Sequence, residues 1–368
     1  MLQLKRPSGT FNISYVIIHP KIVKWETMYM RKDINITEVA KKAGVSIATV
    51  SRVINNTGKV KSSTREKIEK IIDETGYRPN ILARELAEKR TRLIGIITHS
   101  ITGEGIPNSI YGISEELESR NFNIMIACTN GNFENEVKNF HIFQSKRVEG
   151  ILFFTRNFRK EHEEMINRLP FPVIVLLQNT ADKKIPYVAF DNFNFAKEAT
   201  EKLIELGHRN FAFIGGPQDS INSKERYAGF VDALSANSFE INDELLCYGD
   251  FSIESGYEIT EKLITKNRDL TAIVAVNDGM AIGAINCLVE NDYSVPEDFS
   301  VIGLDETTLA KASRPKLSGV FYSYRDLGKT GATMLLRKIE EQTFDYEKHI
   351  IPYEIRLRES VSLVKHSD

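Results

Sequence analysis

The sequence predicts a small all-α head followed by a larger, doubly wound α/β body. Residues 35–55 hold two short helical patterns separated by a glycine turn, a unit too small to bury a core alone. From residue 93 onward, short runs of Ile, Val, Leu and Phe alternate with amphipathic stretches, which is typical of parallel strands buried on both faces. A chain of 368 residues with 42% apolar content is long enough for both parts.

The first helix of the head has strong local signals at both ends. Asn35 can accept a hydrogen bond from an amide of the first turn, and Glu38 can return one, as in a capping box. Gly44 supplies the positive φ that a sharp exit turn needs. The small apolar face consists of three residues at helical spacing: Val39, Ala40 and Ala43.

The second helix is predicted to be exposed on one side. Ser46 is placed to cap it, and its buried stripe consists of Val50, Val53 and Ile54. Three residues then face outward: Ile47, Ala48 and Arg52. Such a helix suits insertion into the major groove of DNA, whereas the alternative is an ordinary helical hairpin within a larger core.

A third helix and a linker complete the head. The helix begins at about Ser62 and closes the small core with Ile68, Ile71 and Ile72, before residues 76–79 end it. Residues 80–89 contain good helix formers but have little to bury, and an isolated helix of this length is marginal in water. A plain linker and a helix that forms only on a partner both remain open.

Charge separates the head from the body. Residues 31–92 carry 15 Lys and Arg against 8 Asp and Glu, although the whole chain has a formal net charge of −2. A basic head on an acidic body indicates an electrostatic footprint for nucleic acid at one end.

Cysteine usage and hydropathy exclude several classes of protein. Cys128, Cys247 and Cys287 lie far apart and form no CxxC motif, so we expect buried free thiols in a reducing cytoplasm and neither disulfides nor a metal site. No apolar run approaches the length of a membrane span. We expect a cytoplasmic protein without a cofactor.

Residues 1–29 are interpreted as a leader. Their short apolar patch is broken by His19 and Pro20, which makes a poor signal peptide. The codons for Trp25 and Glu26 form a purine-rich run that resembles a ribosome-binding site. We therefore hypothesise that translation begins at Met28 or Met30 and that the leader is an upstream-start artefact.

The segment TEVAKKAGVSIATVSRVIN, followed by TREKIEKIIDETGYRPNILARELAEKRTRLIGI, resembles the head and linker of the LacI/GalR family of bacterial transcription regulators. A looser similarity continues to the end of the chain. The pair Ile47 and Ala48 resembles the catabolite-control branch of that family. The resemblance implies a two-lobe body like that of a periplasmic sugar-binding protein, with an effector site between the lobes.

The resemblance also implies the domain boundaries. The chain would cross between the lobes near Asp191, near residues 319–322 and near residues 352–354. The five parts are then a leader (1–29), a helix-turn-helix domain (30–78), a hinge helix and linker (79–92), an N-terminal lobe (93–190 with 320–352) and a C-terminal lobe (191–319 with 353–368).

The resemblance places the DNA contacts on the head. Ile47, Ala48 and Arg52 match the base-reading positions, and arginine pairs well with guanine whereas Ile and Ala suit a thymine methyl. The candidate phosphate contacts and flanking contacts are Ser46, Thr49, Ser51, Asn55, Lys59 and Tyr77. Leu86 matches the leucine that wedges into the minor groove from a hinge helix. Because the family binds as two-fold homodimers, we expect pseudo-palindromic operator DNA.

The effector candidates lie in the segments that follow predicted strands. They are Ser100, Glu104, Phe190, Asp191, Arg226, Asn277 and Asp305. Arg226 matches a family arginine that binds a sugar hydroxyl or carboxylate; the alternative is a surface ion pair. Asp191 is also placed to cap a helix, and Phe190 is either a ligand wall or a core aromatic.

One loop departs from the family pattern. Residues 99–105 (HSITGEG) stand where the family has a Pro-Asp-x-Ser-Asn-Pro-aromatic loop, so the usual acidic and aromatic sugar contacts are missing. This argues against an ordinary hexose effector and leaves a sugar derivative open. His99 is either a structural residue or a ligand contact.

The leading functional prediction is a dimeric repressor whose operator affinity is changed by a small molecule. We expect no catalytic role. One alternative is a solute-binding protein without regulatory activity. Another is a catabolite-control regulator that needs a serine-phosphorylated carrier protein as corepressor, for which Arg314 is the matching position. An enzyme with a nucleotide cofactor is disfavoured because residues 215–217 are the sole glycine-rich strand end and no GxGxxG follows.

Overall fold

A computed structural model describes residues 34–54, 56–77, 90–180, 184–267, 269–305, 307–343 and 345–364. The chain divides into two compact units, residues 1–89 and residues 90–368. The first unit contains the head and the second contains the body.

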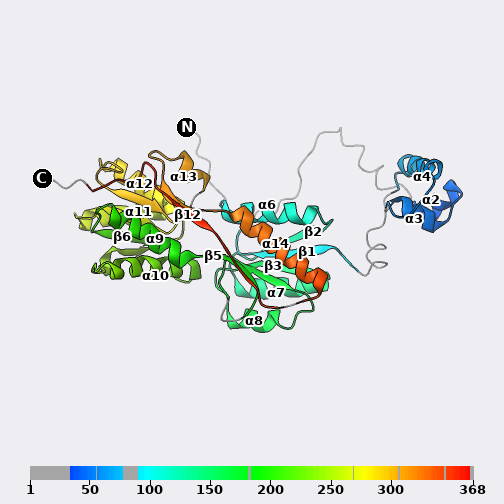
Figure 1. Cartoon of the computed structure of the whole chain (residues 1–368), viewed down its shortest axis with the longest axis horizontal. Coiled ribbons are helices and arrows are strands. Elements are labelled where there is room, and N and C mark those ends of the chain that lie inside the picture. The colour runs from blue at the N-terminus through cyan, green and yellow to red at the C-terminus, as the bar shows by residue number, and fades with distance from the viewer. Residues whose placement is uncertain are drawn as a thin grey trace, which may run out of the picture. The chain divides into compact units, whose positions relative to one another are not determined.

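The described head is a bundle of three helices, drawn in blue in Figure 1: α2 (Ile36–Ala43), α3 (Ile47–Ile54) and α4 (Ser62–Thr75). Their buried side chains form one small core: Val39, Ala40, Ala43, Val50, Val53 and Ile68. Ile71 and Ile72 are half-buried against it. The three predicted helices and their apolar faces are confirmed.

The body contains two six-stranded sheets. The N-terminal sheet has the order β11-β5-β4-β3-β1-β2, and all its neighbouring strands are parallel. Its strands are β1 (Leu93–Thr98), β2 (Asn123–Cys128), β3 (Gly150–Phe154), β4 (Val173–Leu176), β5 (Tyr187–Phe190) and β11 (Lys348–Ile351).

Helices cover both faces of this sheet. They are α6 (Gly105–Glu118), α7 (Phe133–Ser145), α8 (Lys160–Ile166) and α14 (Tyr324–Glu341). Alternate residues of β1 pack on opposite faces: Ile96 lies in the core formed with α6 and α14, whereas Ile97 lies in the core formed with α7. The N-terminal lobe is therefore a doubly wound α/β layer, as predicted.

The C-terminal sheet has the order β12-β10-β9-β8-β6-β7 and is parallel except for β12. Its strands are β6 (Phe211–Gly215), β7 (Leu246–Tyr248), β8 (Ala272–Ala275), β9 (Ser300–Gly303), β10 (Ser318–Tyr322) and β12 (Tyr353–Arg356). The 3-10 helix η2 (Asp243–Leu245) leads into β7.

Two tightly packed helix pairs flank the C-terminal sheet, α9 (Asn192–Glu205) with α10 (Ile221–Ala236) and α11 (Ile253–Lys266) with α12 (Asp278–Glu290) (Figure 1). A glycine permits the second pairing, because a Cβ on Gly283 would lie 2.0 Å from the carbonyl oxygen of Ile253. The short α13 (Thr308–Ala312) follows β9.

The chain passes between the two sheets three times, after β5, after β10 and between β11 and β12. The second crossing differs from the sequence expectation, which assigned residues 320–322 to the N-terminal lobe. Val320 pairs with Ile355, and Tyr322 pairs with Tyr353, in an antiparallel ladder with β12. This ladder keeps β10 in the C-terminal sheet until Ser323, the N-cap of α14.

Candidate DNA-binding helix and effector cleft

Local hydrogen bonds set the position of α3 in the head. The Asn35 side chain accepts from the Glu38 amide at 3.0 Å, and the Glu38 carboxylate accepts from the Asn35 amide at 3.2 Å, which completes the predicted capping box of α2. Gly44 ends α2 with φ 68°. The Ser46 hydroxyl oxygen then accepts from the Thr49 amide at 3.2 Å and caps α3.

One side of α3 is buried and the other is exposed. Val50 and Val53 face the head core. Ile47 is 46% exposed, and Ala48 and Arg52 are also exposed. This face combines two apolar side chains with one guanidinium, which are groups that can contact a thymine methyl and the acceptors of guanine. Their contact with DNA stays a prediction.

The other DNA-contact candidates have different surroundings. Ser51 is half-buried and Lys59 is exposed. Tyr77 is half-buried and packs against the head core, and burial raises the pKa of its hydroxyl. Asn55 and Leu86 lie outside the described residues, as does the expected hinge helix over residues 80–89.

The effector candidates of the body gather where strands of the two sheets end. In open α/β sheets, ligands bind beyond the carboxyl ends of the strands. Phe190 ends β5, Asp305 lies two residues after β9, and Asn277 lies two residues after β8. Direct contacts between the lobes lie near these same ends, where Tyr324 bonds to Asp305 and Gln178 bonds to Asn222.

Arg226 is buried on α10 and joins three strand ends of the C-terminal lobe. Its Nη1 donates to the carbonyl oxygens of Val276 at 2.5 Å and Leu304 at 2.9 Å. Its Nη2 donates to the Tyr322 hydroxyl at 2.9 Å, and its Nε donates to the Asn192 side chain at 2.9 Å. Since a guanidinium has five N–H donors, four are occupied by the protein.

An aromatic cluster fills the region where β5 and β10 leave their sheets. Phe190 is 4% exposed, and its ring centroid lies 4.1 Å from that of Tyr322 and 5.2 Å from that of Tyr324. Phe195 stacks on Tyr322 at 5.4 Å. Phe190 therefore packs within this cluster, in the manner of the core aromatic that the sequence left as an alternative.

Two of the polar candidates cap helices. Asp191 accepts a hydrogen bond from the Asn194 amide at 3.2 Å and caps α9, as predicted. Asn277 accepts from the Met280 amide at 3.0 Å, which caps α12, and it donates to the Phe251 carbonyl oxygen at 3.0 Å. These bonds hold both side chains at the N-termini of their helices.

Side chains bridge the two lobes at several points. Asp305 of the C-terminal lobe accepts from the Tyr324 hydroxyl at 3.3 Å, and burial together with the charge of Asp305 raises the pKa of Tyr324. Gln178, which follows β4, donates to the Asn222 side chain of α10 at 2.8 Å. Gln178 was not among the residues predicted from the sequence, although a polar residue directly after the apolar run of β4 is the signal that marks it.

The departing loop of the first lobe takes part in a further bridge. Glu104 accepts from both the amide and the hydroxyl of Thr308, the first residue of α13. Ser100 is half-buried and bonds to Thr102 within its own loop at 2.8 Å. His99 precedes it, and burial, aided by the charge of Arg156, lowers the pKa of His99 to about 4.

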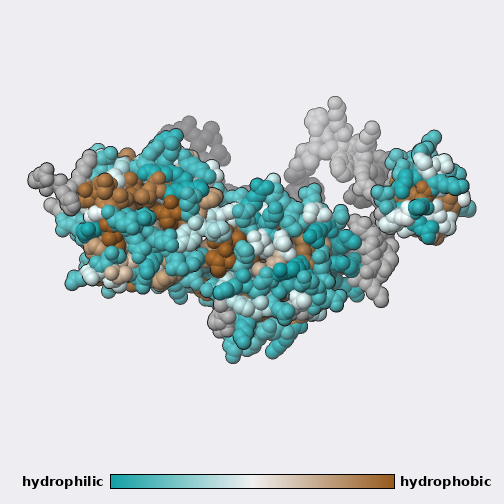
Figure 2. Space-filling view, viewed as in Figure 1, coloured by the Kyte–Doolittle hydropathy of each residue, from teal (hydrophilic) through white to brown (hydrophobic). Residues whose placement is uncertain are grey.

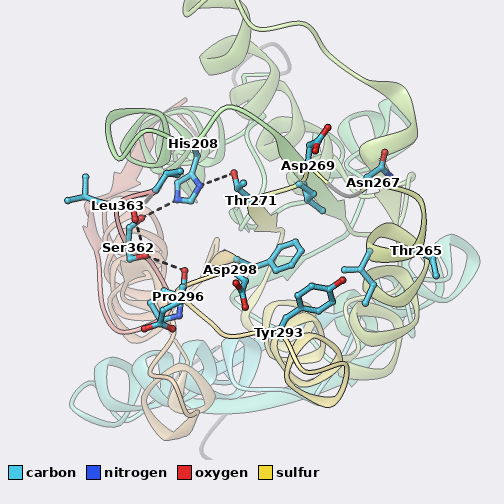
Figure 3. A pocket seen from close by; sticks show the side chains of 15 residues that line it. His208, Thr265, Asn267, Asp269, Thr271, Tyr293, Pro296, Asp298, Ser362 and Leu363 are labelled. Carbon is cyan, nitrogen blue, oxygen red and sulfur yellow. Dashed lines mark hydrogen bonds between the residues drawn. The ribbon is translucent and has the colours of Figure 1, made fainter. Parts of the chain in front are cut away.

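A separate cavity of about 710 Å³ lies in the C-terminal lobe (Figure 3). Thr271 and Phe299 on its wall precede β8 and β9, so it lies at the opposite end of these strands from the cleft. His208 bonds there to the Thr271 hydroxyl at 3.1 Å and to the Ser362 carbonyl oxygen at 3.2 Å, which ties the C-terminal segment to the lobe.

The described residues include no group of three or more His, Cys, Asp and Glu side chains arranged to hold a metal ion. Among the helices in the described ranges, none combines the length and apolar character needed to cross a membrane.

Family models match both parts of the chain. Residues 35–80 match the bacterial regulatory proteins of the lacI family, and residues 200–361 match a periplasmic binding protein-like domain. Catabolite control protein A of Priestia megaterium is 33% identical over 329 residues, which is 89% of this chain and 99% of that protein. The HTH-type transcriptional regulator RegA of Clostridium saccharobutylicum is 32% identical, covering 89% and 98% of the two chains.

Solved structures show the same architecture. A lac repressor dimer bound to operator and the anti-inducer ONPF has a TM-score of 0.83 and 26% identity, covering 90% of this chain and 100% of that one. A complex of the transcriptional regulator CelR with cellobiose has a TM-score of 0.67 and 28% identity, covering 89% and 99%.

Proposed function

Because this chain belongs to the lacI family of bacterial regulatory proteins, it is a DNA-binding transcriptional regulator, and we propose that it is a dimeric repressor controlled by a small molecule. The molecule would bind between the two lobes and change the affinity for operator DNA. The protein would act in the cytoplasm on chromosomal DNA, by binding rather than by catalysis. The exposed face of α3 is the observation that carries the proposal.

In the head, Arg52 would read a guanine, and Ile47 and Ala48 would contact a thymine methyl. The three residues are exposed on one helix whose opposite side is buried, which is the arrangement that major-groove reading requires. The residues that would contact the phosphates or flank them are Ser46, Thr49, Ser51, Asn55, Lys59 and Tyr77. Leu86 would enter the minor groove.

In the body, the effector would be a sugar or a sugar derivative. The solved relatives include one complex with cellobiose and one with ONPF. It would contact Ser100, Glu104 and Asp305, and Asp191 and Asn277 are held near it by helix caps. Arg226 has one N–H left for a ligand and would mainly connect ligand binding to the strand ends.

A two-fold symmetric dimer would bind a pseudo-palindromic operator, because each head would contact one half-site. The related lac repressor structure is a dimer on its operator. In this chain, Figure 2 shows a hydrophobic patch on the C-terminal lobe over α11 and α12, and Val289 of α12 is 53% exposed. Such a surface suits burial against a second copy.

A phosphocarrier corepressor is a further proposal, supported by the catabolite control relatives. Arg314 is exposed, and its Nη1 donates to the carbonyl oxygens of Ala312 at 3.3 Å and Ser313 at 2.8 Å. The guanidinium is thereby held at the surface, where a phosphoserine could pair with it. Calorimetry of a serine-phosphorylated carrier with the wild type and with Arg314→Ala tests this: equal affinities would exclude the role of Arg314.

Selection of duplexes from a random DNA pool by the full chain tests the repressor proposal. We expect enrichment of a two-fold symmetric site whose half-sites contain a guanine. Retention of DNA without an enriched motif would mean that the head binds only the backbone, which contradicts base reading by α3.

A further inference from the structure

The cavity of the C-terminal lobe is a candidate ligand site that is separate from the region between the lobes (Figure 3). Its volume of about 710 Å³ falls within the range of small-molecule pockets, roughly 300–1,000 Å³. Thr271 precedes β8 and Phe299 precedes β9, so the cavity lies at the strand ends remote from the N-terminal lobe. None of the described residues that line it is an effector candidate.

Part of the cavity wall is apolar and aromatic. Tyr293 and Phe299 pack edge to face, with ring centroids 5.1 Å apart. Ile264 of α11 and Leu270 line the cavity with them. Tyr293 keeps 38% of its surface exposed, so this pair is open to a ligand as well as packed against the lobe. Such a wall suits the methylene groups of a ligand, and an aromatic ring also attracts a cation.

The charged side chains among the described lining residues are all carboxylates: Asp269, Glu297 and Asp298. Lys and Arg are absent from the described part of this lining. His208 adds no positive charge at neutral pH, because burial lowers the pKa of its ring. A phosphate or carboxylate ligand would meet like charges here, whereas a cation would meet opposite ones.

The placement of the carboxylates distinguishes an organic cation from a metal ion. Within the described ranges, no three His, Cys, Asp and Glu side chains are grouped to hold a metal. Asp269 lies between α11 and β8, whereas Glu297 and Asp298 lie between α12 and β9. Negative charges on two separate segments, with apolar surface beside them, match a ligand that carries several ammonium groups along a hydrocarbon chain.

We propose that this cavity binds a linear aliphatic polyamine. The carboxylates of Asp269 and Glu297 pair with its ammonium groups, and the rings of Tyr293 and Phe299 contact its methylene groups. The C-terminal segment forms another part of the wall, where the Ser362 carbonyl oxygen bonds to His208 at 3.2 Å. The site requires neither the effector region nor the DNA-binding head, and it therefore goes beyond the proposed function.

Thermal-shift titration of the full chain with spermidine at constant ionic strength provides the first test. We expect the melting temperature to rise and then to level off on a binding curve, because a ligand that binds only the folded protein stabilises it. Ammonium chloride at the same concentration of positive charge controls for screening and should give no such curve. The absence of a binding curve with spermidine, or an equal rise with ammonium chloride, would overturn the proposal.

Variants of the cavity wall provide the second test, with spermidine affinity measured by calorimetry. The double variant Asp269→Asn and Glu297→Gln removes two charges and keeps the bond of Asp298 to the Ser294 amide. We expect its affinity to fall roughly five- to tenfold. Glu254→Gln removes an exposed carboxylate at the other end of α11 and should keep the wild-type affinity. Unchanged affinity in the double variant, or an equal loss in Glu254→Gln, would place the polyamine outside the cavity.

One basic residue adjoins the lining residues in the sequence. Arg268 stands between Asn267 and Asp269, and it lies outside the described residues. If the cavity selects cations, Arg268→Ala should bind spermidine as tightly as the wild type or more tightly, because a like charge is removed. Weaker binding by Arg268→Ala would contradict this selection. These measurements use neither DNA nor sugar, so their failure is distinct from a failure of the operator selection.

Discussion

The carboxylate of Glu104 accepts hydrogen bonds from both the amide and the hydroxyl of Thr308, at 2.9 Å and 3.0 Å, and so ties the N-terminal lobe to α13 of the C-terminal lobe. The two residues are 204 positions apart in the chain. Glu104 belongs to the loop that departs from the family pattern. The departure therefore supplies a direct bridge between the lobes.

Removal of this bridge should favour separation of the lobes. In Glu104→Ala, both bonds are lost, and we expect the bridged arrangement to become about 1 kcal/mol less favourable. Hydrogen exchange at the Thr308 amide should accelerate several-fold. Glu118→Ala changes an exposed carboxylate at the other end of α6 and serves as the control. Unchanged exchange in Glu104→Ala would show that the bridge does not hold the lobes.

Substitution of Arg226 should destabilise the C-terminal lobe. In Arg226→Met, the carbonyl oxygens of Val276 and Leu304 lose their donor within a buried site, and we expect a loss of about 3 kcal/mol in the free energy of unfolding. Urea denaturation measures it. Arg168→Ala, an exposed arginine, should change the value by less than about 0.5 kcal/mol. A much smaller loss in the free energy of unfolding of Arg226→Met would favour a role for Arg226 that is limited to ligand contact.

The two basic side chains of the head should affect DNA binding differently. Arg52→Ala should weaken operator binding by about 1–3 kcal/mol and relax the preference for guanine at one position. Lys59→Ala should weaken binding to all sequences alike and lower the salt slope by about 1. Fluorescence anisotropy at several salt concentrations separates the two. An equal loss on operator and random DNA in Arg52→Ala would argue against base reading.

The pKa of His99 predicts a loss of stability in mild acid. Its pKa is about 4 in the folded protein against 6.5 as the ordinary value, so the unfolded chain binds the proton more readily. Above pH 6.5, His99 is neutral in both the folded and the unfolded chain, and the free energy of unfolding keeps its full value. As the pH falls toward 4, protonation of His99 in the unfolded chain lowers the free energy of unfolding by up to about 3 kcal/mol. Urea denaturation at pH 7.5 and pH 5 should show a smaller loss in His99→Leu than in the wild type. Equal losses would contradict the shift.

The sequence predicted best what is decided locally. The bonds between Asn35 and Glu38 span three residues, and the cap at Ser46 spans the same distance, so residue type and spacing were sufficient. The strands were likewise visible as apolar runs, because strands buried on both faces need apolar side chains throughout.

The sequence could not predict contacts between distant segments. Arg226 was predicted as an effector contact, but its partners Val276, Leu304 and Tyr322 lie 50 to 96 positions later in the chain and meet it only in the folded lobe. The extension of β10 to Tyr322 depends on a ladder with β12, which no local pattern shows. Gln178 was found only from its hydrogen bond to Asn222, which lies 44 positions later in the chain.

We propose that one ligand-controlled equilibrium of the lobes governs DNA binding. The most direct measurement is the dissociation constant of the full chain for its selected operator, with and without a saturating sugar that stabilises the protein thermally. We expect a change of roughly 5- to 150-fold, in either direction, as is usual for coupled sites. The same affinity with and without the bound sugar would contradict it, since a ligand that binds both lobe arrangements equally shifts neither.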